Sequence, residues 1–134
     1  MDPLTPAEAF VGIAFCAAYS DGTMGAEEDQ ELSEQLQSCH ALVDLDEADL
    51  RAAMMKVDAI ARKHGDAALL AHAAAALPPE LRETAFCLGA ELVVADGEFA
   101  REERSFLERL RSALAVEPAL AQRIMDVLSI RDRG

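Results

Sequence analysis

The amino-acid sequence predicts an all-α protein, and three features lead to that fold class. Its 134 residues are 51% hydrophobic but only 4% aromatic, with seven glycines and five prolines, fewer than a turn-rich β fold needs. Apolar residues recur at intervals of three and four along most of the chain, as on one face of a helix. No stretch shows the sustained apolar–polar alternation of half-buried strands. We therefore expect a single domain of about seven helices over residues 1–134.

The first two predicted helices lie within the first forty residues. Thr5-Pro6-Ala7-Glu8 has the form of a capping box with proline at the first helical position, and the apolar residues after it predict a buried, central helix. This helix should end at Asp21-Gly22, because glycine readily takes the left-handed conformation that ends helices. A second helix is expected from about Ala26 to Cys39.

The next three predicted helices cover residues 46–64, 66–77 and 79–95. Acidic residues from Asp46 onward suit the first turn of the third helix, and His64-Gly65 should end it. Asp66 is placed to cap the alanine-rich fourth helix. Pro78-Pro79 breaks that helix and starts a fifth, which is apolar on most sides and should end at Asp96-Gly97.

The last two predicted helices begin near Arg101 and at Glu117-Pro118. Both carry apolar residues at helical spacing, which predicts that each packs one face against the core. These residues are Phe106, Leu107, Leu110 and Leu114 in the sixth helix, and Leu120, Ile124, Val127 and Leu128 in the seventh.

The chain contains an internal repeat, in which Asp21 corresponds to Asp96, 75 residues further on. Residues 17–32, AAYSDGTMGAEEDQEL, align without a gap on residues 92–107, LVVADGEFAREERSFL. Each copy has a buried helix, an Asp-Gly pair, a short loop with one apolar residue, two glutamates and an amphipathic helix. We interpret this pattern as two pseudo-symmetric αα-hairpins over approximately residues 5–39 and 79–114.

The repeat places carboxylates at equivalent corners of the two hairpins. Asp21 and Asp96 follow helix ends, where the helix dipole disfavours an anion by up to about 1 kcal/mol. Glu28 and Glu103 lie seven residues later, in the first turn of the next helix. If the hairpins pack about a pseudo-twofold axis, the four side chains converge on an all-oxygen site that suits Ca²⁺ or Mg²⁺. Alternatively, each aspartate accepts hydrogen bonds from neighbouring backbone N–H groups, and the glutamates are ordinary capping residues.

The doubled element resembles the TerB (tellurite-resistance protein B-like) family. The characteristic stretch of that family is Ala-Asp-Gly, two residues, a short spacer and a Glu before an amphipathic helix. Ala95-Asp96-Gly97-Glu98-Phe99 with Glu103 matches this stretch, and Ser20-Asp21-Gly22-Thr23-Met24 with Glu28 matches it with serine in place of alanine. The resemblance implies a helical domain with an acidic, metal-binding surface cluster, and the candidate metal ligands are Asp21, Glu28, Asp96 and Glu103. It also implies a cytoplasmic role near the inner membrane in the response to tellurite and other chemical stress.

The distribution of charge limits the possible partners. The formal net charge is -13, and residues 1–50 hold twelve acidic side chains and no Lys or Arg. Such a chain binds nucleic-acid phosphates poorly and is repelled by anionic membrane surfaces. No apolar run approaches the roughly 20 residues that span a bilayer, so we expect no direct membrane insertion. The expected partner is a protein with a basic face, such as a member of a membrane-associated stress-resistance complex, and docking of such a partner without metal is the alternative function.

The sequence gives no positive sign of catalysis. Cys16, Cys39 and Cys87 lie in apolar or helical contexts without a His and an Asp placed to assist a nucleophile. Cys39-His40 lacks the second Cys/His pair of a zinc site. We therefore expect a non-enzymatic TerB-like protein of the cytoplasm whose cofactor, if it has one, is a divalent cation.

Overall fold

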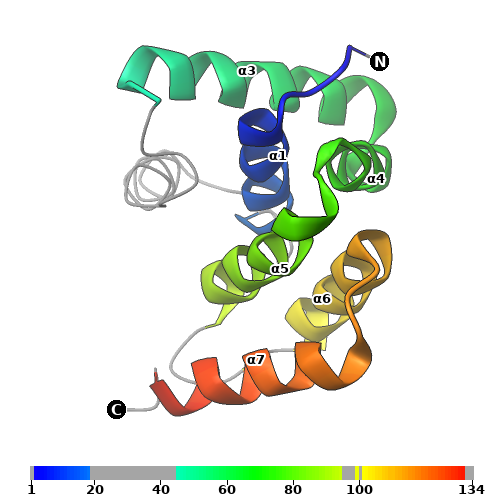
Figure 1. Ribbon diagram of the computed structural model, residues 1–134. Coiled ribbons are helices and arrows are strands. Elements are labelled where there is room, and N and C mark those ends of the chain that lie inside the picture. Colours follow the sequence, from blue (N-terminus) through cyan, green and yellow to red (C-terminus); the bar gives the residue numbers. More distant parts are fainter. Residues whose placement is uncertain (1, 19–44, 95–98, 100, 132–134) are drawn as a thin grey trace.

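The computed structural model describes residues 2–18, 45–94, 99 and 101–131 (Figure 1). All the regular structure in these residues is helical, which confirms the predicted all-α class. The second predicted helix, at residues 26–39, lies outside the described residues. The six described helices are α1 (Pro6–Ala18), α3 (Glu47–His64), α4 (Asp66–Ala76), α5 (Pro79–Val93), α6 (Arg101–Leu114) and α7 (Pro118–Arg131).

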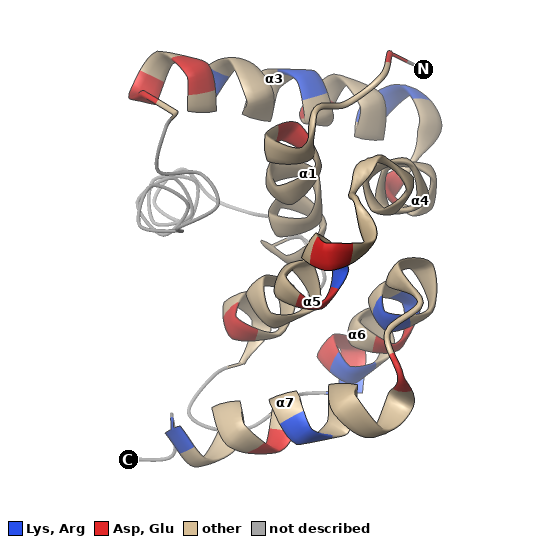
Figure 2. Cartoon of the chain, in the orientation of Figure 1, with Lys and Arg blue, Asp and Glu red and all other residues tan. Residues whose placement is uncertain are grey.

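Helix α1 is the central element of the fold. Every residue from Ala9 to Ala17 is buried, and the helix packs against α3, α4 and α5. Its one charged side chain, Glu8, lies in its first turn, and the rest of the ribbon carries no charge (Figure 2). A helix that is apolar on all sides has no stable position at a surface, so the other helices must surround it.

The remaining helices pack around α1 in two groups. Helices α3 and α4 contact α1 and each other, α7 contacts α5, and α6 contacts both α5 and α4 and so joins the two groups. Figure 1 shows α3 and α4 at one end of the molecule and α6 and α7 at the other, with α5 between the two groups. None of the described helices combines the length and the apolar character that crossing a bilayer requires.

Local sequence signals determine where α3 begins and ends. The Asp46 side chain caps the helix by accepting a hydrogen bond from the Asp49 backbone N–H at 2.7 Å. Acidic residues in the first turn and basic residues in the last complement the helix dipole (Figure 2). At the C-terminal end Gly65, with φ 92°, donates its N–H to Ala61, in a conformation that only glycine adopts easily.

Two details of the sequence prediction are wrong. Asp66 does not cap α4, because Gly65 serves as the C-cap of α3 and as the N-cap of α4, and Asp66 is already the first helical residue. The connection is too short for a separate capping side chain. Val127 is not buried with its neighbours, since α7 buries only Ala121 and Leu128 and leaves Val127 62% exposed. Helix α7 lies at the edge of the fold, where one narrow stripe is enough to pack against α5.

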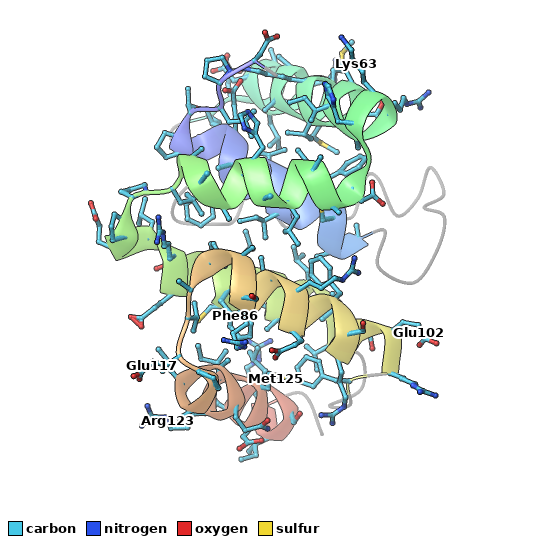
Figure 3. All side chains as sticks on the ribbon, turned by 90° about the vertical axis from the view of Figure 1, so that its right-hand side faces the viewer. Lys63, Phe86, Glu102, Glu117, Arg123 and Met125 are labelled. Carbon is cyan, nitrogen blue, oxygen red and sulfur yellow. The ribbon has the colours of Figure 1, made fainter. Side chains whose placement is uncertain are left out.

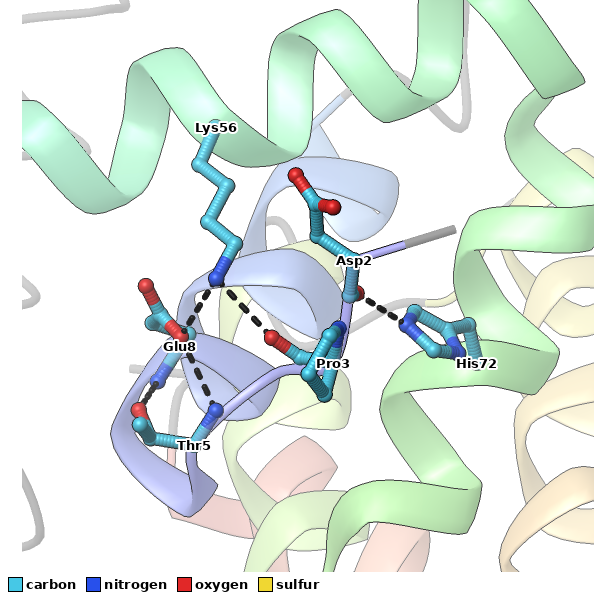
Figure 4. A network of polar contacts seen from close by, with 6 residues as sticks. All are labelled: Asp2, Pro3, Thr5, Glu8, Lys56 and His72. Atoms are coloured by element: carbon cyan, nitrogen blue, oxygen red, sulfur yellow. Dashed lines mark hydrogen bonds and ion pairs between the residues drawn. The ribbon is translucent and has the colours of Figure 1, made fainter.

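A network of polar contacts holds the N-terminal segment against α3 and α4 (Figure 4). The predicted capping box is present: the Thr5 backbone N–H donates to Glu8 Oε1 at 2.9 Å, and the Glu8 N–H donates to Thr5 Oγ1 at 3.1 Å. Lys56 of α3 donates to Glu8 Oε1 at 3.1 Å and to the Pro3 carbonyl at 2.9 Å. His72 of α4 contacts the Asp2 carbonyl through Nε2 at 2.7 Å. The segment before α1 is therefore fixed from two sides.

The first prediction concerns Glu8 and the pH dependence of stability. The hydrogen bond from the Thr5 backbone, helped by Lys56, lowers the pKa of Glu8 below its ordinary value of 4.5. A carboxyl group with a lowered folded-state pKa stabilises the fold above its unfolded pKa and loses that effect as the pH falls through the folded pKa. At pH 7 the Glu8→Gln variant should lose about 0.5–1 kcal/mol of unfolding free energy. In urea denaturation this difference should shrink below pH 4.5, and a difference that is constant from pH 7 to pH 3 would contradict the assignment.

The second prediction uses the two glycines that lie inside buried helices. A Cβ atom added at Gly89 would come within 2.5 Å of Leu110 Cδ2, whereas one added at Gly12 would meet its neighbours at ordinary distances of 3.4–3.5 Å. Overpacking costs about 1–3 kcal/mol, and replacing a helical glycine by alanine gains about 1 kcal/mol. We expect Gly89→Ala to lower the unfolding free energy by about 1 kcal/mol and Gly12→Ala to leave it unchanged or raise it. Equal effects of both substitutions in denaturant titrations would show that the close approach at Gly89 does not matter.

Candidate functional site

The four predicted metal ligands divide between described and undescribed parts of the chain. Asp21, Glu28 and Asp96 lie outside the described residues. Glu103 is described: it lies in the first turn of α6 and is partly buried. The sequence predicted this position, and an acidic side chain there interacts favourably with the positive end of the helix dipole.

The helices on either side of the second Asp-Gly pair form the αα-hairpin that the repeat predicts. Helix α5 ends at Val93, the Val94 N–H donates to the Ala90 carbonyl at 3.1 Å, and α6 packs back against α5. Phe99, the apolar residue of the connection, is buried in the core. Its carbonyl accepts a hydrogen bond from Arg104 Nε at 3.1 Å. Phe99 is thus held by the burial of its side chain and by a contact from α6 that the sequence did not indicate.

The helix before the first Asp-Gly pair occupies the same place in its copy of the repeat as α5 does in the second copy. Under the alignment that places Asp21 on Asp96, residues 6–18 of α1 correspond to residues 81–93 of α5, and all of these residues are helical. The described C-terminal part of α1 and the N-terminal end of α6 lie on the same side of the molecule, where Figure 3 labels Glu102.

The described residues alone do not assemble a metal centre. In residues 2–18, 45–94, 99 and 101–131, no three His, Cys, Asp or Glu side chains gather closely enough to hold an ion. Only Glu103 of the predicted ligand set belongs to these ranges. The four-carboxylate site therefore stays a prediction.

A comparison with known protein families agrees with the helical fold and with the family resemblance of the sequence. The family model described as "Tellurite resistance protein TerB" matches residues 7–126, from the first turn of α1 into α7. The chain belongs to the TerB family. Membership suggests a role related to tellurite resistance. Neither the curated proteins nor the solved structures gave a match.

Helix α6 of this TerB protein has a small positive charge, although the chain as a whole is strongly acidic. The helix carries four of the chain's twelve basic side chains, Arg101, Arg104, Arg109 and Arg111. Arg111 donates hydrogen bonds to Glu108, the shortest from Nη2 to Oε1 at 2.6 Å, and they lower the pKa of the Glu108 carboxyl group. The spacing of the arginines is visible in the sequence, but their hydrogen bonds depend on how the chain folds around α6.

The two described cysteines of the TerB fold are poor nucleophiles at neutral pH. The pKa of the Cys16 thiol is raised to about 12, chiefly by burial and also by the charge of Asp66, against the opposing effect of Arg109. The pKa of the exposed Cys87 is also raised, by desolvation and by Glu83 and Glu91 one turn away on either side. Since the thiolate is the reactive form, neither side chain is activated. Cys39 lies outside the described residues.

The third prediction concerns the reactivity of these thiols. In a Cys39→Ser background, a thiol reagent at pH 8 should modify Cys87 in the folded protein and Cys16 only after denaturant is added. Replacing Glu83 and Glu91 by glutamine removes two negative charges near Cys87, so its thiolate population and its rate should rise about two- to fivefold. The double variant Glu117→Gln/Asp126→Asn, which also removes two negative charges but lies outside α5, serves as the control. Equal rates in all three proteins would mean that the two carboxylates do not affect Cys87.

Proposed function

We propose that this TerB protein is a non-enzymatic stress protein that acts in tellurite resistance by binding a divalent cation at its two Asp-Gly corners. The ligands in this proposal are Asp21, Glu28, Asp96 and Glu103. The observation that supports it is the match between the repeat and the helices, since α1 and α5 are helical over equivalent residues and an Asp-Gly pair follows each of them in the sequence.

The chemistry of the four side chains favours a hard cation. Ca²⁺ takes six to eight oxygen ligands at about 2.3–2.6 Å, and carboxylates are its usual protein ligands. An aspartate after a helix end is disfavoured by the helix dipole, and carboxylates brought close together repel one another. A bound divalent cation removes both costs. The net charge of -13, with the excess concentrated in residues 1–50, adds to the attraction for cations.

The same acidic segment supports a role in docking. Residues 1–50 hold twelve acidic side chains and no Lys or Arg, and a partner with a basic face complements this charge electrostatically. We place the protein in the cytoplasm, with a protein of a membrane-associated stress-resistance complex as its partner. Docking without metal is the second candidate function. It predicts a complex that weakens with salt and persists when Asp21 and Asp96 are both replaced by asparagine.

The fourth prediction tests the cation site directly. Calorimetric titration of the full chain with CaCl₂ and, separately, MgCl₂ should give saturable heat for at least one ion, together with a higher melting temperature that EDTA reverses. A ligand at 100 times its Kd stabilises the folded state by about 2.7 kcal/mol. Asp96→Asn should weaken the binding at least tenfold, because it removes a charged ligand. Asp126→Asn on α7 should not, although it changes the net charge equally.

Two results would count against the cation site. The first is the absence of both heat and a thermal shift with either ion in the unmodified protein. The second is binding that Asp96→Asn and Asp126→Asn weaken to the same extent, since this would reflect general attraction to an acidic protein.

A further inference from the structure

A pocket between α6 and α7 combines an apolar floor with an arginine whose charge is not neutralised by the described residues. Its volume is about 260 Å³, and its floor is formed by Phe86 of α5, Leu107 of α6 and Met125 of α7. Figure 3 shows Phe86 and Met125 where these three helices come together. The proposed cation site does not use this pocket.

The rim of the pocket is formed by one face of α6. Arg104, Glu108 and Arg111 lie four and three residues apart, so they follow one another along the same side of the helix. Arg111 is fully engaged, because Nε and Nη2 bind Glu108 and Nη1 donates to the Val116 carbonyl at 3.0 Å. The charges of Arg111 and Glu108 therefore compensate each other.

Arg104 differs from Arg111 in that only part of its guanidinium group is used. Its Nε donates to the Phe99 carbonyl, which fixes the orientation of the group at the pocket rim. Its Nη1 and Nη2 atoms make no hydrogen bond or ion pair with the part of the chain that the structure describes. The rim thus carries a net charge of about +1 on a protein whose overall charge is -13.

We propose that this pocket binds a small amphipathic carboxylate. The carboxylate accepts hydrogen bonds from Nη1 and Nη2 of Arg104, and a short apolar chain lies on Phe86, Leu107 and Met125. The planar guanidinium group matches the two oxygens of a carboxylate, and its anchoring at Nε reduces the conformational entropy lost on binding. Because the chain as a whole repels anions, this local contact must supply the attraction.

The size and the lining of the pocket define the class of ligand further. A volume of 260 Å³ holds about nine water molecules at about 30 Å³ each, which corresponds to a ligand with eight or nine non-hydrogen atoms. A six-carbon alkanoate has this size. Burial of its chain contributes about 25 cal/mol per Å² of apolar surface, a gain that inorganic anions lack. We therefore expect alkanoates of about this length to bind more tightly than phosphate.

The fifth prediction tests the pocket by NMR titration of the ¹⁵N-labelled full chain with sodium hexanoate in the presence of EDTA. EDTA excludes divalent cations, so the result is independent of the proposed cation site. We expect saturable shifts of amide signals in α6 and α7. The affinity should be at least tenfold lower for Arg104→Gln but unchanged for Arg109→Gln, a substitution on the same helix outside the pocket. Hexanamide, which has the same chain without the charge, should bind at least tenfold more weakly than hexanoate.

A second variant tests the shape of the pocket separately from its charge. Ala121 is a small, buried residue of the lining, and Ala121→Leu should fill the pocket and abolish hexanoate binding while Arg104 is retained. Melting curves establish that each variant is folded before it is titrated. The proposal is overturned if hexanoate causes no saturable shifts in the unmodified protein, if Arg104→Gln and Arg109→Gln bind it equally, or if hexanamide binds as tightly.

Discussion

The burial of α1 on all sides is the constraint on which the rest of the structure depends. From Ala9 to Ala17 this helix has no solvent-facing side, so α3, α4 and α5 must cover it. The buried residues of the described chain include no charged side chain, although the protein is strongly acidic. In this part of the chain, charge is therefore confined to helix ends and outer faces, and apolar packing must offset the mutual repulsion of these groups.

The helices could be predicted where short-range stereochemistry determines their ends. The Thr5–Glu8 capping box, the glycine at position 65 and the prolines at 79 and 118 act through neighbouring backbone atoms, and each marks a helix end in the structure. Which helices surround α1 could not be deduced in this way, because packing depends on residues far apart in the chain. Gly65 is both the C-cap of α3 and the N-cap of α4, so Asp66 is the first residue of α4 and does not cap it. This arrangement depends on the length of the connection between α3 and α4, which the capping signals alone do not determine.

The proposed cation site and the pocket between α6 and α7 differ in how far the sequence predicts them. The acidic corners follow from the repeat, and the structure adds that α1 and α5 are helical over equivalent residues and that Glu103 lies in the first turn of α6. The pocket was not foreseen, because three helices contribute to it. Its only sequence signal is the spacing of Arg104, Glu108 and Arg111, which is equally common on a solvated helix face. The hydrogen bond to the Phe99 carbonyl, which sets Arg104 apart, exists only in the folded chain.

The attachment of the N-terminal segment has a consequence for how this region can diverge among related proteins. Lys56 and His72 hold residues 3 and 2 through their main-chain carbonyl oxygens and not through their side chains. Every amino acid has the same carbonyl group, so the residues at positions 2 and 3 can change without loss of either contact. An added or deleted residue before the helix would instead displace both acceptors at once. Evolution should therefore conserve the spacing of this segment more strictly than its composition.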